Sequence, residues 1–204
     1  MKFKIIPAII AKNQNELDLR LNKVRCMDFV HLDIMDNKFV NNRSLMFDFK
    51  LNVKNEAHLM VNNPIDWIKK FSGKVNEIIV HIESCTDIQG LIESLKHKKV
   101  SLALNPKTPV EKIIPLLDTV NKILVMTVQP GSYGAGFLQY SLKKVKLLRE
   151  LSPKLDIAVD GSINLHTIKL VKDAGANQFV IGSYLQNSTN IKTDLKKIWS
   201  KILS

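Results

Sequence analysis

One predicted strand carries ionisable side chains in an otherwise apolar setting. In FVHLDIMD, residues 29–36, His31 and Asp33 alternate with Leu32 and Ile34, so the histidine and the aspartate share one face of the strand. An unpaired carboxylate inside a protein costs several kcal/mol, and its charge must be compensated. The stretch therefore predicts a partner of opposite charge next to Asp33.

Two residues of the same chemistry stand at comparable positions on other predicted strands. His58 lies in EAHLMV, and Asp160 lies near the end of LDIAVDG. With His31 and Asp33 they would supply two imidazoles and two carboxylates, a ligand set that suits a first-row divalent cation. We predict one bound divalent metal ion, for which zinc, iron(II), manganese and cobalt are all suitable on the ligand set alone.

Short aliphatic strands alternate with amphipathic helices along the whole chain. Eight such units predict a parallel sheet closed into one (β/α)8 TIM barrel, a single catalytic domain over residues 1–204. A doubly wound sheet is disfavoured because the residues after the first strand, AKNQNEL, contain no glycine. The predicted strands are residues 4–10, 29–34, 56–61, 76–82, 99–105, 122–128, 155–161 and 177–183.

Two of the connecting helices are predicted as continuous elements. One covers residues 109–120 and opens at Pro109, a residue favoured in the first turn of a helix. The other is the last helix of the chain, which runs from the end of the eighth strand to Trp199.

Polar side chains gather where the predicted strands end. In addition to the four residues above, His81 lies at the end of the fourth strand with Glu83 directly after that strand, and Asn105 ends the fifth. The carboxyl ends of the strands form the face of a TIM barrel that carries the chemistry. We therefore expect these side chains to surround one site.

Loops rich in glycine and serine follow the last three predicted strands. Each offers free backbone N–H groups, and the last two are expected to lead directly into helix N-termini, which suits a phosphate group. The candidate phosphate-binding residues are Gly131, Ser132, Tyr133, Gly134, Gly161, Ser162, Gly182 and Ser183.

Methionines stand beside the ionisable residues. Met35 and Met60 have the same strand parity as Asp33 and His58, and Met126 lies on the sixth predicted strand. Methionine commonly fills protein cores, but in these positions its thioether would form a polarizable wall that keeps water from the site.

Composition narrows the function classes. The net charge of +11 is first interpreted as a solvated surface, because the lysines are spread along the chain, and second as an attraction for small phosphorylated substrates. The lysines are not interleaved with aromatics, so no specific nucleic-acid binding is expected. We find no apolar run of 18 residues, so no membrane span is expected, and we expect no signal peptide. The two cysteines lack CxxC spacing, which suits a reduced, cytoplasmic protein.

The ordered motifs resemble those of the ribulose-phosphate 3-epimerase family, which has a TIM barrel of the ribulose-phosphate-binding type. The similar blocks are HLDIMDNKFVNN, EAHLMVNNP, ALNPKTP, VMTVQPGSYGAGF, AVDGSI and AGANQFVIGS, and they cover nearly the whole chain. The resemblance implies a cytoplasmic isomerase of the pentose phosphate pathway, a phosphorylated ketose as substrate, and a homo-oligomer.

The same resemblance assigns roles. His31, Asp33, His58 and Asp160 match the metal ligands, and Asp33 and Asp160 also match the acid–base pair that inverts C3 of D-ribulose 5-phosphate to give D-xylulose 5-phosphate through a metal-stabilised enediolate. Met35, Met60 and Met126 match the methionines that line the intermediate, and the glycine–serine loops match the phosphate-binding positions.

Two alternatives stay open. Ala8 stands where the family usually has a serine, and the loop at residues 131–136 differs from the family pattern, which leaves room for a ketohexose 6-phosphate. The other alternative is a barrel without catalytic activity that binds a phosphorylated sugar.

Overall fold

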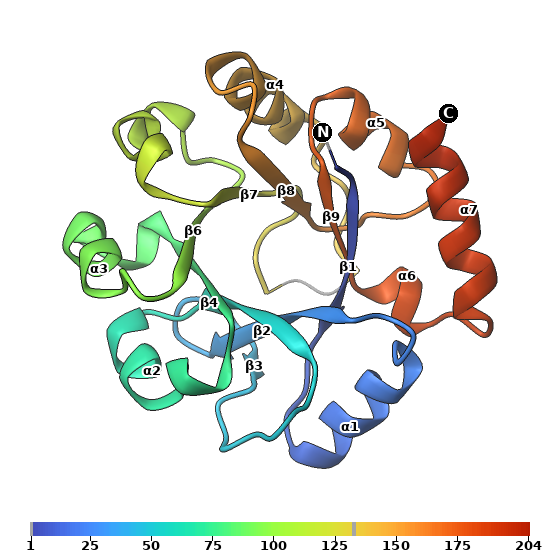
Figure 1. The fold of residues 1–204 in the computed structure, drawn as a ribbon, viewed down its shortest axis with the longest axis horizontal. Helices are drawn as coiled ribbons and strands as arrows, with labels where there is room; N and C mark the ends of the chain where they lie inside the picture. Colours follow the sequence, from blue (N-terminus) through green and yellow to red (C-terminus); the bar gives the residue numbers. More distant parts are fainter. Residues whose placement is uncertain (1, 132–133) are drawn as a thin grey trace.

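A closed barrel of parallel strands forms the centre of the molecule. The structure is a computed structural model that describes residues 2–131 and 134–204. Within these residues, each barrel strand pairs in parallel with the next, and β1 pairs with both β9 and β2, which closes the barrel (Figure 1). The predicted (β/α)8 fold is confirmed. The barrel strands are β1 (Lys4–Ile9), β2 (Phe29–Asp36), β4 (Lys54–Met60), β5 (Glu77–His81), β6 (Lys99–Leu104), β7 (Lys122–Met126), β8 (Asp156–Asp160) and β9 (Gln178–Ile181).

A ring of helices surrounds the strands (Figure 1). Outward-facing strand residues such as Leu32 and Leu59 are fully buried beneath Trp67 and Phe71, which lie on the apolar side of α2. This burial of both sheet faces explains why the strands are nearly continuous in aliphatic residues. The helices are α1 (Gln14–Lys23), α2 (Pro64–Phe71), α3 (Ile88–Ser94), α4 (Leu142–Leu151), α5 (Ile168–Asp173), α6 (Ser183–Gln186) and α7 (Ile191–Leu203).

Residues 109–120 do not form the continuous α-helix that we predicted. They form two 3-10 helices, Val110–Lys112 and Ile114–Thr119. Pro115 explains the difference, because a proline inside a helix lacks the N–H donor and clashes with the preceding turn. Further 3-10 helices cover Ser72–Lys74, Ile82–Ser84 and Gln139–Ser141.

The predicted last helix is also divided in two. The short helix α6 follows β9 directly, and α7 begins after Asn190, whose side chain accepts a hydrogen bond from the N–H of Thr193. This cap starts a new helix and satisfies one of its free N–H groups. In the part of the chain that the structure describes, no helix has both the length and the apolar character needed to cross a membrane.

A short strand that we did not predict lies beside the end of β2. The strand β3 (Arg43–Ser44) pairs antiparallel with it, so that Ser44 is opposite Met35. The buried hydroxyl of Ser44 accepts a hydrogen bond from the N–H of Ala11 at 2.9 Å. The long connection after β2 is thereby tied to the segment that follows β1.

Candidate active site

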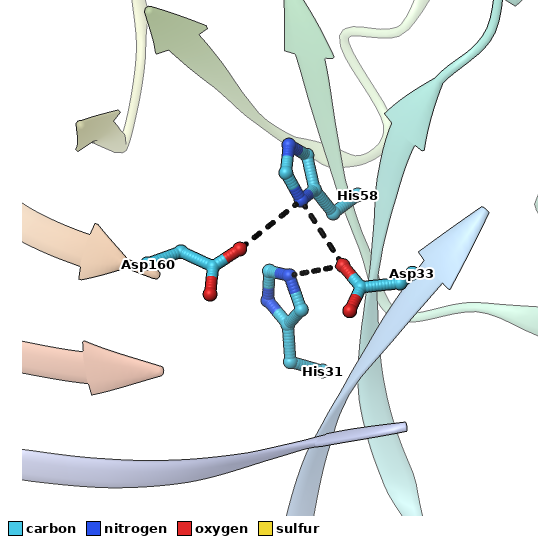
Figure 2. Close-up of side chains that lie close together, drawn as sticks. All are labelled: His31, Asp33, His58 and Asp160. Carbon is cyan, nitrogen blue, oxygen red and sulfur yellow. Dashed lines mark hydrogen bonds and ion pairs between the residues drawn. The ribbon is translucent and has the colours of Figure 1, made fainter. Parts of the chain in front are cut away.

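Four side chains from three strands converge inside the barrel near the carboxyl ends of the strands. Asp33 on β2 is the register partner of His58 on β4, and His31 lies one pleat earlier on β2. Asp160 is the last residue of β8 and points at the other three side chains from across the barrel (Figure 2). One ligand atom from each residue lies within 4.8 Å of the others. The structure therefore brings together all four predicted residues.

The shortest contacts join both histidines to one carboxylate oxygen. Oδ1 of Asp33 lies 3.3 Å from Nε2 of His31 and 3.3 Å from Nδ1 of His58. The same Nδ1 of His58 lies 3.8 Å from Oδ2 of Asp160 (Figure 2). The Asp160 side chain is 14% exposed, so it is the most open of the four to an approaching ligand.

A buried carboxylate that the sequence analysis missed orients His31. Oε1 of Glu56 lies 2.7 Å from Nδ1 of His31, and the other oxygen of Glu56 accepts a hydrogen bond from Lys122. Burial disfavours the charged form of His31, but the carboxylates of Asp33 and Glu56 outweigh this and raise the pKa of His31 to about 10. The sequence did contain a signal for this residue. Glu56 is two positions before His58, and side chains two positions apart on a strand point to the same face.

The two aspartates have opposite electrostatic environments. Burial would raise the pKa of Asp33, but the close contacts with the imidazoles of His31 and His58 lower it well below the usual value. Burial raises the pKa of Asp160 to about 7, and the nearby charge of Asp33 adds to this effect. Near neutral pH, the pair therefore consists of one ionised carboxylate and one carboxyl group that can hold a proton.

The cluster fits a small divalent cation. Nε2 of His31 is buried and forms no well-aligned hydrogen bond among the residues described, and its contact with Oδ1 of Asp33 is 3.3 Å long. A buried nitrogen without a partner is unfavourable, and a cation would satisfy it. Two imidazoles and two carboxylates are ligands of zinc and of its first-row neighbours.

A pocket opens directly above this cluster. Asp33 and Asp160 line its floor, and Met35, Met60 and Met126 line its walls. Met35 and Met60 are register partners, and Met126 is the register partner of Asp160. The three predicted methionines thus surround the two carboxyl groups and restrict access of water.

The glycine–serine loops form the other side of the same pocket. Its lining includes Gly131, Gly134, Gly161, Ser162, Gly182 and Ser183. Ser132 and Tyr133, which we also predicted to bind phosphate, lie outside the described residues.

Two of these glycines are required by the backbone. Gly131 and Gly161 have φ angles of +76° and +119°. A Cβ atom would lie 2.5 Å from Cβ of Val40 in the first case and 2.6 Å from Cγ2 of Val128 in the second. Both glycines permit close approach between neighbouring loops.

The loop after β8 does not lead directly into a helix, which corrects our prediction. Asn164 and Thr167 hold a turn in which the Thr167 hydroxyl donates to the carbonyl oxygen of Ser162 at 2.9 Å, and α5 begins only at Ile168. The hydroxyl of Ser162 donates to the carbonyl oxygen of Ala135, so it connects this loop with the loop after β7. The loop after β9 does run directly into α6, as expected.

A second, open cleft of about 940 Å³ lies at the opposite end of the barrel. It is lined by residues that precede or begin β2 and β4, such as Asp28, Val30 and Lys54. In the described residues, the one grouping of acidic, histidine or cysteine side chains suited to a metal is the cluster at Asp33. The chemistry therefore belongs to the smaller pocket at the carboxyl ends of the strands.

Comparison with known proteins agrees with this geometry. Residues 4–186 match the sequence profile described as the ribulose-phosphate 3 epimerase family. The chain belongs to this family. Members of the ribulose-phosphate 3-epimerase family are carbohydrate epimerases, and the chain is therefore an isomerase, as predicted.

Named relatives of the epimerase family cover most of the chain. The cytoplasmic isoform of ribulose-phosphate 3-epimerase from Oryza sativa subsp. japonica is 35% identical over 195 residues, which cover 88% of this chain and 86% of the relative. Ribulose-phosphate 3-epimerase from Bacillus subtilis (strain 168) is 31% identical, with 96% and 97% covered. These relatives support a pentose-phosphate epimerase activity for this chain.

More distant structures share only the fold with this epimerase-family chain. The crystal structure of 3-hexulose-6-phosphate synthase from Salmonella typhimurium superposes with a TM-score of 0.67 at 15% identity and covers 98% of each chain. A tryptophan synthase alpha-subunit from Pyrococcus furiosus also reaches a TM-score of 0.67, at 18% identity, covering 100% of this chain and 99% of its own.

Proposed function

We propose that this chain interconverts D-ribulose 5-phosphate and D-xylulose 5-phosphate by inverting C3. The observation that carries the proposal is the pair of carboxyl groups, Asp33 and Asp160, that reach the same pocket from different sides of the barrel. Inversion through a planar intermediate needs one group to remove a proton from one face and another to return a proton on the opposite face. Strands β2 and β8 supply these two positions.

The exchange needs one carboxyl group that accepts a proton and one that delivers a proton. We assign Asp33 as the group that accepts the C3 proton, which is acidified by the neighbouring C2 carbonyl, and Asp160, after it takes up a proton, as the group that delivers it to the other face. In the metal-free site the pKa of Asp33 is lowered and that of Asp160 is raised to about 7, which agrees with this assignment because Asp160 takes up a proton more readily. The reverse reaction starts from the reverse protonation states, so either epimer can serve as substrate.

A divalent cation completes the proposed site. His31, Asp33, His58 and Asp160 would hold it, with zinc as the first choice and iron(II), manganese and cobalt as alternatives. When bound, it supplies positive charge beside the oxygen atoms on which negative charge develops as the C3 proton leaves.

The remaining pocket residues position the substrate. Met35, Met60 and Met126 exclude water from the reacting carbons, which limits the loss of the transferred proton to solvent. The backbone around Gly161, Gly182 and Ser183 provides the proposed phosphate site at the other side of the pocket. The net charge of +11 favours the approach of an anionic sugar phosphate.

A substrate panel on protein of measured metal content tests the proposal. We expect interconversion of the two pentulose 5-phosphates, loss of activity on chelation, and a lower kcat/KM for ketohexose 6-phosphates. A preference for six-carbon substrates would support the alternative that Ala8, whose methyl group lines the pocket, leaves space for a longer sugar. Tight binding without turnover of any ketose phosphate would support the non-catalytic barrel.

We also propose the assembly, location and nucleic-acid binding of this chain. It is a homo-oligomer, it acts in the cytoplasm, and it binds nucleic acid only weakly and without sequence preference. Sedimentation analysis of the purified protein measures the oligomeric state. A salt titration tests the nucleic-acid binding, because contacts with phosphate alone weaken steeply as salt increases.

A further inference from the structure

A third histidine connects the candidate site with the barrel wall. His81 is the last residue of β5 and is fully buried, and its Nε2 lies 2.9 Å from Nε2 of His58. The two rings stack with centroids 4.9 Å apart and an interplanar angle of 24°. On the other side of the ring, Nδ1 of His81 lies 3.1 Å from Oε2 of Glu83. The proposed proton transfer uses neither His81 nor Glu83.

Glu83 is held as an ionised hydrogen-bond acceptor. Its second oxygen accepts hydrogen bonds from the N–H of Asn105 at 3.0 Å and from the hydroxyl of Thr108. Burial would raise the pKa of Glu83, but the hydrogen bonds from His81 and Thr108 lower it to about 2. Because an ionised carboxylate can only accept, Nδ1 of His81 carries a proton.

That proton determines which nitrogen of His58 is protonated. When neutral His81 has its proton on Nδ1, its Nε2 has a lone pair and accepts the Nε2–H of His58. Nδ1 of His58 then keeps its lone pair, which faces Asp33 at 3.3 Å and Asp160 at 3.8 Å.

We propose that His81 and Glu83 are positioning residues that hold His58 in the Nε2–H tautomer and leave its Nδ1 free to bind a divalent cation. This inference rests on the cation site of the proposed function. A ligand histidine whose other N–H donates to a fixed acceptor is oriented and made more basic, and loss of such an acceptor typically weakens metal affinity.

Metal affinity of three variants tests this role. In His81→Phe, the ring can still stack on His58 and contact Phe39, whose ring centroid lies 5.0 Å away, but it accepts no hydrogen bond. We expect the Kd for zinc, measured by competition with a chelator, to rise about 10- to 100-fold. His81→Gln restores an acceptor and should stay within about threefold of wild type, whereas Glu83→Gln should lie between the two variants.

Tautomer populations give a readout that loss of packing alone would not change. Proton–nitrogen correlation spectra of histidine-labelled, metal-free protein should show His58 as the Nε2–H form in wild type and as the Nδ1–H form, donating to Asp33, in His81→Phe. His97→Gln, at an exposed position, is the matched control and should change neither the tautomer nor the Kd.

The outcomes separate this inference from the function on which it rests. If wild type binds zinc with the same Kd as His81→Phe, or if His58 of wild type is the Nδ1–H form, the positioning role is wrong. If wild type binds none of the four candidate metals, the cation site itself is wrong. Circular dichroism and the Tm of each metal-free variant show whether the barrel is intact.

Discussion

Asp33 and His58 face each other as register partners on adjacent parallel strands, with Oδ1 of the aspartate 3.3 Å from Nδ1 of the histidine. This contact follows from the pairing of β2 with β4. A shift of one residue in that register would turn one of the two side chains outward, because successive side chains of a strand point to opposite faces. The geometry of the proposed site thus depends on the same backbone hydrogen bonds that build the barrel.

Removal of either proposed proton carrier should abolish most activity. We expect Asp33→Asn and Asp160→Asn each to lower kcat by about 10²- to 10⁴-fold, the usual contribution of a positioned acid or base. A coupled assay with ribulose 5-phosphate and, separately, with xylulose 5-phosphate measures the effect in both directions.

Asp28→Asn is the matched control for these variants. Asp28 is exposed and lies immediately before β2, at the opposite end of that strand from the pocket. Its kcat should equal that of wild type. Activity within a few-fold of wild type in both Asp33→Asn and Asp160→Asn would refute the two-carboxyl mechanism.

The raised pKa of Asp160 predicts how stability changes with pH in the metal-free protein. Unfolded Asp160 loses its proton near pH 3.8, whereas folded Asp160 keeps it until about pH 7. The folded state is therefore progressively destabilised as pH rises from about 4 to 7, and the full penalty applies above pH 7. Asp160→Asn removes this titration and should stabilise the metal-free protein by on the order of 2 kcal/mol at pH 8.

Denaturant unfolding after dialysis against a chelator measures this difference. At pH 5, where folded Asp160 is protonated, the free energies of unfolding of the variant and of wild type should differ much less than at pH 8. A variant that is less stable than wild type at pH 8 would show that the carboxylate is not strained by burial in the metal-free state.

Metal binding should release protons. The pKa of His31 in the metal-free protein is about 10, so a cation must displace the proton on its ring. We expect about one proton released per zinc ion at pH 8 and about two at pH 6, where Asp160 is also protonated. Calorimetry in buffers of different ionisation enthalpy measures the number.

Substitution of the carboxylate behind His31 should reduce this release. Glu56→Gln removes one of the two charges that raise the pKa of His31, so fewer protons should leave at pH 8. The substitution also removes the charge of Glu56 from the buried Lys122, whose contact with Glu77 is longer, at 3.8 Å, so the Tm of the variant must be measured in parallel. A binding enthalpy that does not depend on the buffer would contradict the prediction.

Gly161 is expected to tolerate no side chain. Its φ of +119° is unfavourable for other residues, and a Cβ would lie 2.8 Å from the backbone nitrogen of Val128, which cannot move without disturbing the loop after β7. We expect Gly161→Ala to lower the free energy of unfolding by about 2–4 kcal/mol and to weaken substrate binding. Gly73→Ala, where no atom lies within 4 Å of the added Cβ, is the control and should unfold like wild type.

Much of the fold could be predicted because its signals are local. Strand parity placed His31 and Asp33 on one face, and the alternation of aliphatic strands with amphipathic segments predicted the barrel that the structure confirms. The prediction was wrong where one residue outweighed the overall pattern. Pro115 divides residues 109–120 into two 3-10 helices, and Asn190 starts a separate last helix.

The order of the residues indicates which chemical groups are present and that the strand ends gather them at one end of a barrel. The contacts between individual atoms depend on how the strands pair in the folded barrel. The contacts of His31 with Glu56, and of His58 with His81, join residues more than 20 positions apart. Barrel closure brings Asp160 to within 3.8 Å of His58. The opposite pKa shifts of Asp33 and Asp160 arise from burial and from neighbouring charges, which exist only once the chain is folded.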